Sequence, residues 1–199
     1  TINPDFSQVE VDRQQTNFDR FELFFPERRQ FFLENEDLFN NLGMDRIRPF
    51  FSRRIGLNSP IGYGARLSGK LNKNLRIGAM HIKTNNLENT LNTDQHYSVI
   101  TVQQKVFSRS NISAVIINRD NFSTDDYNRN LGLEYNLASK NNEVRGKFIY
   151  YQSFTDEQNA GNNMYAGSFT FNNRRWIINS RIENTGKGYN ADVGFIQRV

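Results

Sequence analysis

Apolar and polar residues alternate along most of the chain after residue 60. Leu or Tyr occupies each odd position from 131 to 137, whereas Asn, Gly and Glu occupy the even positions from 130 to 136. A period of two residues is typical of a strand with two different faces. The same pattern, weaker in places, predicts nine candidate strands, most of them about 8–11 residues long. They are residues 61–70, 75–83, 97–107, 112–119, 127–137, 144–153, 165–171, 176–182 and 191–199.

The connections between these strands alternate in length. Short turns at 72–74, 108–110, 139–142 and 172–173 alternate with longer polar links at 84–95, 120–126, 154–163 and 183–190. Outer-membrane barrels place short turns on one rim and long loops on the other, and their tilted strands cross the bilayer with about 9–11 residues. Soluble antiparallel sheets also alternate. Strand length, loop alternation and aromatic residues near the strand ends favour the membrane barrel.

Residues 1–60 have a different character. They hold all four prolines and ten of the 17 phenylalanines, often in pairs that cannot share one strand face. We expect a strand end near residues 9–12, a short helix at 27–34 and otherwise irregular packing, as a plug or loop, against something larger. The chain therefore divides into 1–60 and 61–199. It is expected to begin inside a strand at Thr1.

The predicted fold is all-β: an antiparallel up-and-down meander that forms part of a transmembrane outer-membrane β-barrel, with an irregular Phe-rich N-terminal segment. Bacterial single-chain barrels have even strand numbers, so nine strands indicate an incomplete barrel. Its edges are expected to pair with missing parts of the same barrel or with another chain. The side chains predicted to face lipid are Leu131, Leu133, Tyr135, Leu137, Phe148, Tyr150, Phe169, Phe171, Trp176 and Ile178. Those predicted to face the lumen are Asn130, Glu134, Asn136, Arg145, Lys147, Ser168, Asn179 and Arg181.

Charge adds a second feature to the lumen. The predicted basic residues there are Arg66, Lys70, Arg76, Arg119, Arg145, Lys147, Arg175, Arg181 and Arg198, against the acidic residues Glu134 and Asp192. Two alternatives could offset this positive field: an anionic cargo, or a plug formed by residues 21–37. The second is favoured, and its candidate acids are Glu22, Glu27, Glu34, Glu36 and Asp37. A solvated basic lumen without a plug stays open as a third reading.

Composition excludes several classes. The formal net charge is +4, from 25 basic and 21 acidic residues, and no basic run of five residues occurs, so nucleic acid is not an expected partner. The absence of Cys excludes disulfides and thiol chemistry. A mean hydropathy of −0.71, without any long apolar run, excludes helical membrane spans.

Residues with catalytic potential are few. His81 and His96 are the only histidines, and they are interpreted as strand-end residues rather than metal ligands. No zinc-protease, P-loop or nucleophile-elbow motif occurs. Carboxylates in residues 1–60 could serve a glycoside hydrolase, which needs two at a defined separation, or could simply be solvated or paired with arginines. We expect no catalytic residues, no cofactor and no metal.

Three segments carry a family resemblance. Residues 1–12 (TINPDFSQVEVD), 24–34 (FFPERRQFFLE) and 49–56 (PFFSRRIG) resemble, in this order, a Bacteroidota family of uncharacterised outer-membrane proteins, and residues 64–70 fit its following strand. The resemblance is specific over residues 1–70, although Gln30 stands where Pro is more frequent. It implies an N-terminal carbohydrate-binding-type β-sandwich joined to a large C-terminal β-barrel, of which this chain would be an inner part. It implies no catalytic residues.

These observations lead to three functional hypotheses. The first is an outer-membrane β-barrel of a Gram-negative bacterium that transports or assembles envelope or polysaccharide cargo. The second is a surface glycan-binding protein for which the barrel is an anchor, and the third is a carbohydrate-active hydrolase. The expected partners are outer-membrane lipid, the rest of the barrel and a glycan.

Overall fold

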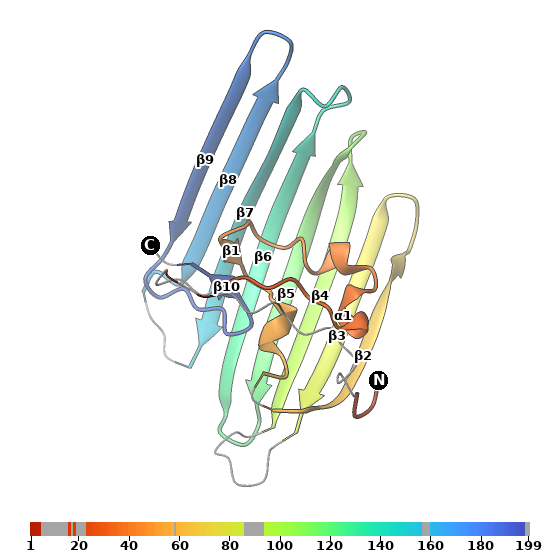
Figure 1. Cartoon of the computed structure of the whole chain (residues 1–199), viewed down its shortest axis with the longest axis vertical. Coiled ribbons are helices and arrows are strands. Elements are labelled where there is room, and N and C mark those ends of the chain that lie inside the picture. Colours follow the sequence, from red (N-terminus) through yellow and green to blue (C-terminus); the bar gives the residue numbers. More distant parts are fainter. Residues whose placement is uncertain are drawn as a thin grey trace.

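The computed structural model describes residues 1–4, 16, 18, 23–57, 59–85, 94–156 and 160–197. An eight-stranded antiparallel sheet dominates it, and each strand pairs with its neighbour in sequence (Figure 1). The strands are β2 (Ile61–Lys70), β3 (Leu75–Thr84), β4 (Gln95–Val106), β5 (Ser110–Asn121), β6 (Asp126–Ala138), β7 (Val144–Thr155), β8 (Asn163–Asn172) and β9 (Ile177–Thr185). The predicted all-β antiparallel meander is confirmed.

Short turns join the strands at one end of the sheet, which is the upper end in Figure 1. Asn side chains close two of them: the Asn72 carbonyl oxygen accepts hydrogen bonds from two backbone amides at 2.8 and 2.9 Å, and Asn173 does the same at 2.8 and 2.7 Å. Such local bonding explains why Asn favours turns. At the other end, the link predicted at 120–126 is wrong in length, because pairing continues to Asn121 and Asp126 and leaves four residues between the strands.

The ninth predicted strand is also wrong. Residues 191–197 do not extend the meander, and residues 198–199 lie outside the described residues. Instead, β10 (Phe195–Ile196) pairs with β1 (Ile47–Arg48) in a separate two-stranded sheet. The physical reason is burial. Val193 packs into the core formed with residues 32–55, and Phe195 is buried against the rings of Phe24 and Phe51, so neither faces an alternate side of a sheet edge.

The large sheet is open. Its order runs from β2 to β9, and these two edge strands do not pair with each other in the part of the chain that the structure describes. Residues 1–3 lie along the free edge of β2: the Asn3 amide donates to the Gly62 carbonyl at 2.7 Å, and the Gly64 amide donates to the Thr1 carbonyl at 2.9 Å. The expected strand end at 9–12 lies outside the described residues.

A strap, residues 23–57, crosses one face of the sheet (Figure 1). It contains the short helix α1 (Gln30–Leu33), two 3₁₀ turns (Glu36–Leu38 and Ser52–Arg54) and β1. The helix is shorter than the predicted 27–34. It begins only at Gln30 because the Glu27 carboxylate binds the Arg28 and Arg29 amides, at 3.0 and 2.8 Å, in extended backbone before the first turn.

The strap and residues 186–197 cover what we call the inner face of the sheet. One continuous core joins them to this face. The strap and the C-terminal segment contribute Phe32, Leu38, Phe39, Leu42, Ile47, Phe50, Ile55, Tyr189 and Val193. The inner face contributes Met80, Ile82, Val99, Val115, Ile117, Ile149, Tyr151 and Met164.

The opposite, outer face is apolar and uncovered by any described residue. Its exposed side chains include Leu67, Ile100, Val102, Ile112, Ile116, Leu131, Leu133, Phe148, Tyr150, Tyr165, Ile178 and Ile182. The register confirms the predicted division of side chains between two faces. The exception is Trp176, which lies with Arg175 in the turn before β9. Within the described ranges, no helix has the length and hydropathy to span a membrane.

Candidate functional site

A cavity of about 570 Å³ lies between strap residues 37–48 and the inner face. Its charged lining consists of Asp37, Asp45, Arg48, Arg76, Glu134, Lys147 and Arg181. Amides and hydroxyls make up most of the remainder, from Asn40, Asn41, Gln103, Asn111, Ser113, Asn136 and Ser168. We treat this polar cavity as the candidate site.

Glu134 is the buried acid of the cavity, and only 3% of it is exposed. Its carboxylate accepts hydrogen bonds from the Tyr151 hydroxyl at 2.7 Å and from the Gly43 amide at 2.6 Å, and it pairs with the Lys147 ammonium at 3.1 Å. A buried carboxylate is stable only when its oxygens have such partners. Glu134 therefore holds the strap against β6 and β7.

Two glycines make this arrangement possible. The Tyr151 ring lies over Gly132, where an added Cβ would stand 2.1 Å from a ring carbon. Gly43 has φ +79°, a left-handed conformation that favours glycine, and an added Cβ would stand 2.1 Å from the Ile47 carbonyl oxygen. The tight turn after Gly43 directs its amide to Glu134. Lys147 completes the attachment by donating to the Asn41 carbonyl.

A second ion pair attaches the strap at β3. The Arg76 guanidinium donates to both carboxylate oxygens of Asp37, at 2.5 and 3.1 Å. These bonds and the Arg76 charge outweigh partial burial and hold the pKa of Asp37 below its ordinary value. The paired geometry is the strong bidentate form of an arginine–carboxylate contact.

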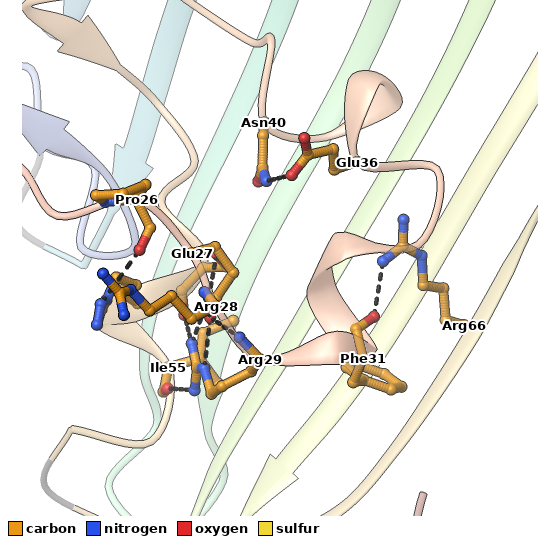
Figure 2. A network of polar contacts seen from close by, with 11 residues as sticks. Pro26, Glu27, Arg28, Arg29, Phe31, Glu36, Asn40, Ile55 and Arg66 are labelled. Atoms are coloured by element: carbon orange, nitrogen blue, oxygen red, sulfur yellow. Dashed lines mark hydrogen bonds and ion pairs between the residues drawn. The ribbon is translucent and has the colours of Figure 1, made fainter. Parts of the chain in front are cut away.

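Arg66 on β2 provides a third attachment. Figure 2 shows its guanidinium donating to the Phe31 carbonyl, at 2.7 Å. The same group lies 4.7 Å from the centre of the Phe39 ring, a cation–π contact. Phe39 itself packs on Gly78, where an added Cβ would stand 2.7 Å from the ring. Glu34 and Glu36 attract Arg66 electrostatically without a direct ion pair among the described contacts.

Glu27 is turned away from the basic wall. Its carboxylate pairs with Arg29 at 2.8 Å and accepts the Ser52 hydroxyl at 2.6 Å, while Arg29 also donates to the Ile55 carbonyl at 2.7 Å (Figure 2). Burial alone would raise the pKa of Glu27, but the bonds from Arg29 and Ser52 outweigh it and lower that pKa. Glu27 therefore stabilises the strap internally. Figure 2 also shows Glu36 accepting from the Asn40 amide within the strap.

The remaining predicted basic residues are dispersed. Arg119 pairs with Asp126 and Asp192, each at 2.7 Å, and Arg181 pairs with Glu183 and, at 3.8 Å, with Asp45. Lys70 and Arg145 lie on the inner face near the short turns. Arg175 was expected on a strand of that face but lies in a turn. Arg198 and Glu22 lie outside the described residues.

Sequence reasoning missed Gly43, Tyr151 and the attachments of Glu134. The available signal was the small inner-face positions, Gly78 and Gly132, which leave room for an aromatic ring. His81 and His96 share the outer face, with ring centres 5.6 Å apart. Among the described residues, no group of three or more His, Cys, Asp or Glu has an arrangement that could hold a metal ion.

Comparison with known families gives one match. Residues 1–92 match the family described as Domain of unknown function (DUF5916). This match spans the strap, β2 and β3, and all three resembling segments of the sequence lie inside it. No curated protein and no solved structure matches the chain.

Proposed function

We propose that this chain forms a section of the wall of an outer-membrane β-barrel, with the strap occupying the lumen. The single observation that supports this most strongly is the contrast between the two faces of one sheet. The inner face is covered and carries buried polar groups, whereas the outer face presents exposed aliphatic and aromatic side chains. A soluble protein seldom leaves an apolar surface of this extent in water.

The distribution of charge on the outer face supports a lipid contact. Its charged side chains, such as Lys83, Asp120 and Arg129, lie near the long-link ends of the strands, and the outer-face positions in the middle of each strand carry no charge. A Lys or Arg at the bilayer midplane on the lipid side costs about 2–4 kcal/mol. In this proposal β2 and β9 pair with further strands, of the same barrel or of another chain, because unpaired edges are not tolerated in lipid.

The polar cavity supports a role in handling hydrophilic cargo. Charged groups, amides and hydroxyls line it, which suits a saccharide better than an apolar molecule. We propose transport or assembly of envelope or polysaccharide material, in a Bacteroidota outer-membrane protein of the kind that the three resembling segments suggest. The amide-rich lining also favours a second candidate, surface glycan binding with the barrel as anchor.

Cysteine labelling tests the membrane assignment, since the chain has no native Cys. Single substitutions Leu133→Cys and Phe148→Cys on the outer face are compared with Asn136→Cys on the inner face and Lys140→Cys in a turn, in native membranes of cells that express the full protein. The outer-face thiols should react with a lipid-soluble reagent and resist a water-soluble one. Labelling of Leu133→Cys by the water-soluble reagent as fast as Lys140→Cys would refute the proposal.

Conductance separates transport from simple anchoring. Deletion of residues 21–37 from the full protein removes the Phe31, Asp37 and Glu34 side of the strap, and the single-channel conductance in planar bilayers should increase. The outer-face labelling pattern, measured on the same variant, shows that the barrel is still inserted. Unchanged pore size and ion selectivity would refute the plug and favour the anchored glycan-binding protein.

A further inference from the structure

A second cavity, of about 540 Å³, lies at the short-turn end of β2–β5, beside Asn35 of the strap. Among the described residues, its lining includes five cationic side chains and no carboxylate. The five that line this basic cavity are Lys70, Lys73, Arg76, Lys105 and Arg109. The strap does not neutralise them. Only Arg76 has an ion pair, with Asp37, whereas the other four have no ion pair and no side-chain hydrogen bond to a described residue.

The strand register brings two of these positive charges close together, which increases the electrostatic repulsion between them. Lys70 lies directly opposite Arg76 across the β2–β3 pair. Like charges in directly opposed positions destabilise a sheet, and Lys73, in the connecting turn, adds a third charge nearby. A single Asp37 leaves most of this charge without a counter-charge, so a bound anion would stabilise this end of the sheet.

The rest of the lining narrows the chemistry of that anion. It consists only of amides, a hydroxyl and their backbone, from Asn35, Asn74, Gln103, Ser110 and Asn111. No aromatic or aliphatic side chain of the described residues lines the cavity, so neither a stacked base nor an acyl chain has an apolar partner there. Amides and hydroxyls instead match the hydroxyl groups of a sugar.

We propose that the basic cavity binds an acidic saccharide, whose anionic groups contact Lys70, Lys73, Lys105 and Arg109 and whose hydroxyls contact the amides. This inference deepens the proposed function by assigning the charge class of the cargo. It rests on that function only in placing the cavity inside the barrel, at the short-turn opening.

Binding is measured on the full protein in detergent, with a galacturonate oligosaccharide of defined length as the probe. A neutral glucose oligosaccharide of equal length tests whether binding requires negative charge. Tripolyphosphate tests whether negative charge is sufficient without a sugar. The triple variant Lys70→Gln, Lys73→Gln, Lys105→Gln should lose at least about tenfold in affinity for the galacturonate probe. The control variant Lys140→Gln, Arg174→Gln, Arg175→Gln removes three exposed charges from other turns of the same rim and should change the affinity less than about twofold.

Three results would overturn the inference. They are equal binding of the neutral oligosaccharide, tighter binding of tripolyphosphate than of the galacturonate probe, and an equal loss in the control variant. Outer-face labelling of Leu133→Cys in each variant shows whether the protein is folded. Because labelling and binding are separate measurements, failure of the membrane assignment and failure of the saccharide site are distinguishable.

Discussion

The inner face of the sheet has two halves that share the same strands but differ in chemistry. Towards the long links, β4 and β7 place Val99, Ile149 and Tyr151 under the strap, where they are buried. Towards the short turns, the same two strands place Lys105 and Arg145 on the same face, outside the core. The apolar half fixes the strap, and the polar half leaves two cavities open. Where alternation changes from apolar to charged within a strand, the contact between strap and sheet changes from buried apolar packing to polar bonds such as Arg76 with Asp37 and Lys147 with Asn41.

Several substitutions test this comparison through opening of the strap. Opening is measured as the rate at which a cysteine at Leu42, a core position only 5% exposed, reacts with a pyridyl disulfide reagent that works from neutral to acidic pH. Substitutions in the apolar half should promote opening far more than substitutions at the rim of the polar half.

The largest effect is expected for Phe39→Ala. This ring is 1% exposed and fills the space above Gly78, so its removal should favour strap opening by about 3–5 kcal/mol. The matched control is Leu33→Ala, in the same segment but 38% exposed. This substitution should favour strap opening by less than about 1 kcal/mol. Equal effects would mean that the apolar half does not fix the strap.

A smaller effect is expected at the boundary between the halves, for Glu134→Gln. The neutral amide keeps the shape but removes the charge facing Lys147, which should favour opening by about 2–3 kcal/mol. The double variant with Lys147→Met, measured in a double-mutant cycle, should recover part of this loss. Complete additivity of the two substitutions would show that the ion pair does not contribute.

The next largest effect is expected for acidic pH, which should promote opening of the strap. The pKa values of Glu27 and Asp37 are lowered from ordinary values of 4.5 and 3.8. A carboxyl with a lowered pKa in the folded state stabilises that state above its ordinary pKa, and the contribution is lost as the pH falls through the lowered value. Opening should therefore be constant from about pH 7 to 5 and increase below about pH 4.5. In Glu27→Gln, Asp37→Asn the increase should be reduced, and an unchanged acid response would contradict the assignment.

The smallest effect is expected for Asp45→Asn. Its carboxylate lies 3.8 Å from Arg181, but its side chain is 85% exposed, and such pairs contribute little. Opening should change by less than about 0.5 kcal/mol. A change as large as that of Glu134→Gln would remove the distinction between the buried boundary and the exposed rim.

The meander could be predicted because each strand has one covered and one uncovered face, which imposes alternation on residues such as 130–137. The positions at which β5 and β6 end and begin could not be predicted in this way. Asn121 and Asn128 are of a residue type that is typical of loops, yet both are buried. The Asn128 side chain donates to the Asn190 carbonyl, which is distant in the sequence, at 3.1 Å. Burial of a polar side chain depends on a partner that local sequence does not reveal.

The candidate site was only partly predictable for the same reason. The basic inner-face positions followed from alternation, but Glu134 depends on the Gly43 amide, 91 positions away, and on the Tyr151 hydroxyl, 17 positions away. Residues 191–199 alternated like a strand, and only burial against distant rings explains why Phe195 packs away from the meander instead. Periodicity reports which face a residue takes, but not which distant segment covers that face.

The pairing of β1 with β10 imposes an order on assembly. Every pairing within the meander joins consecutive strands, whereas Ile47 pairs with Ile196, near the other end of the chain. Contacts between sequence neighbours form quickly, and those that close a long loop form slowly. Formation of the two-stranded sheet is therefore expected to follow formation of the hairpins of the meander that lies between β1 and β10.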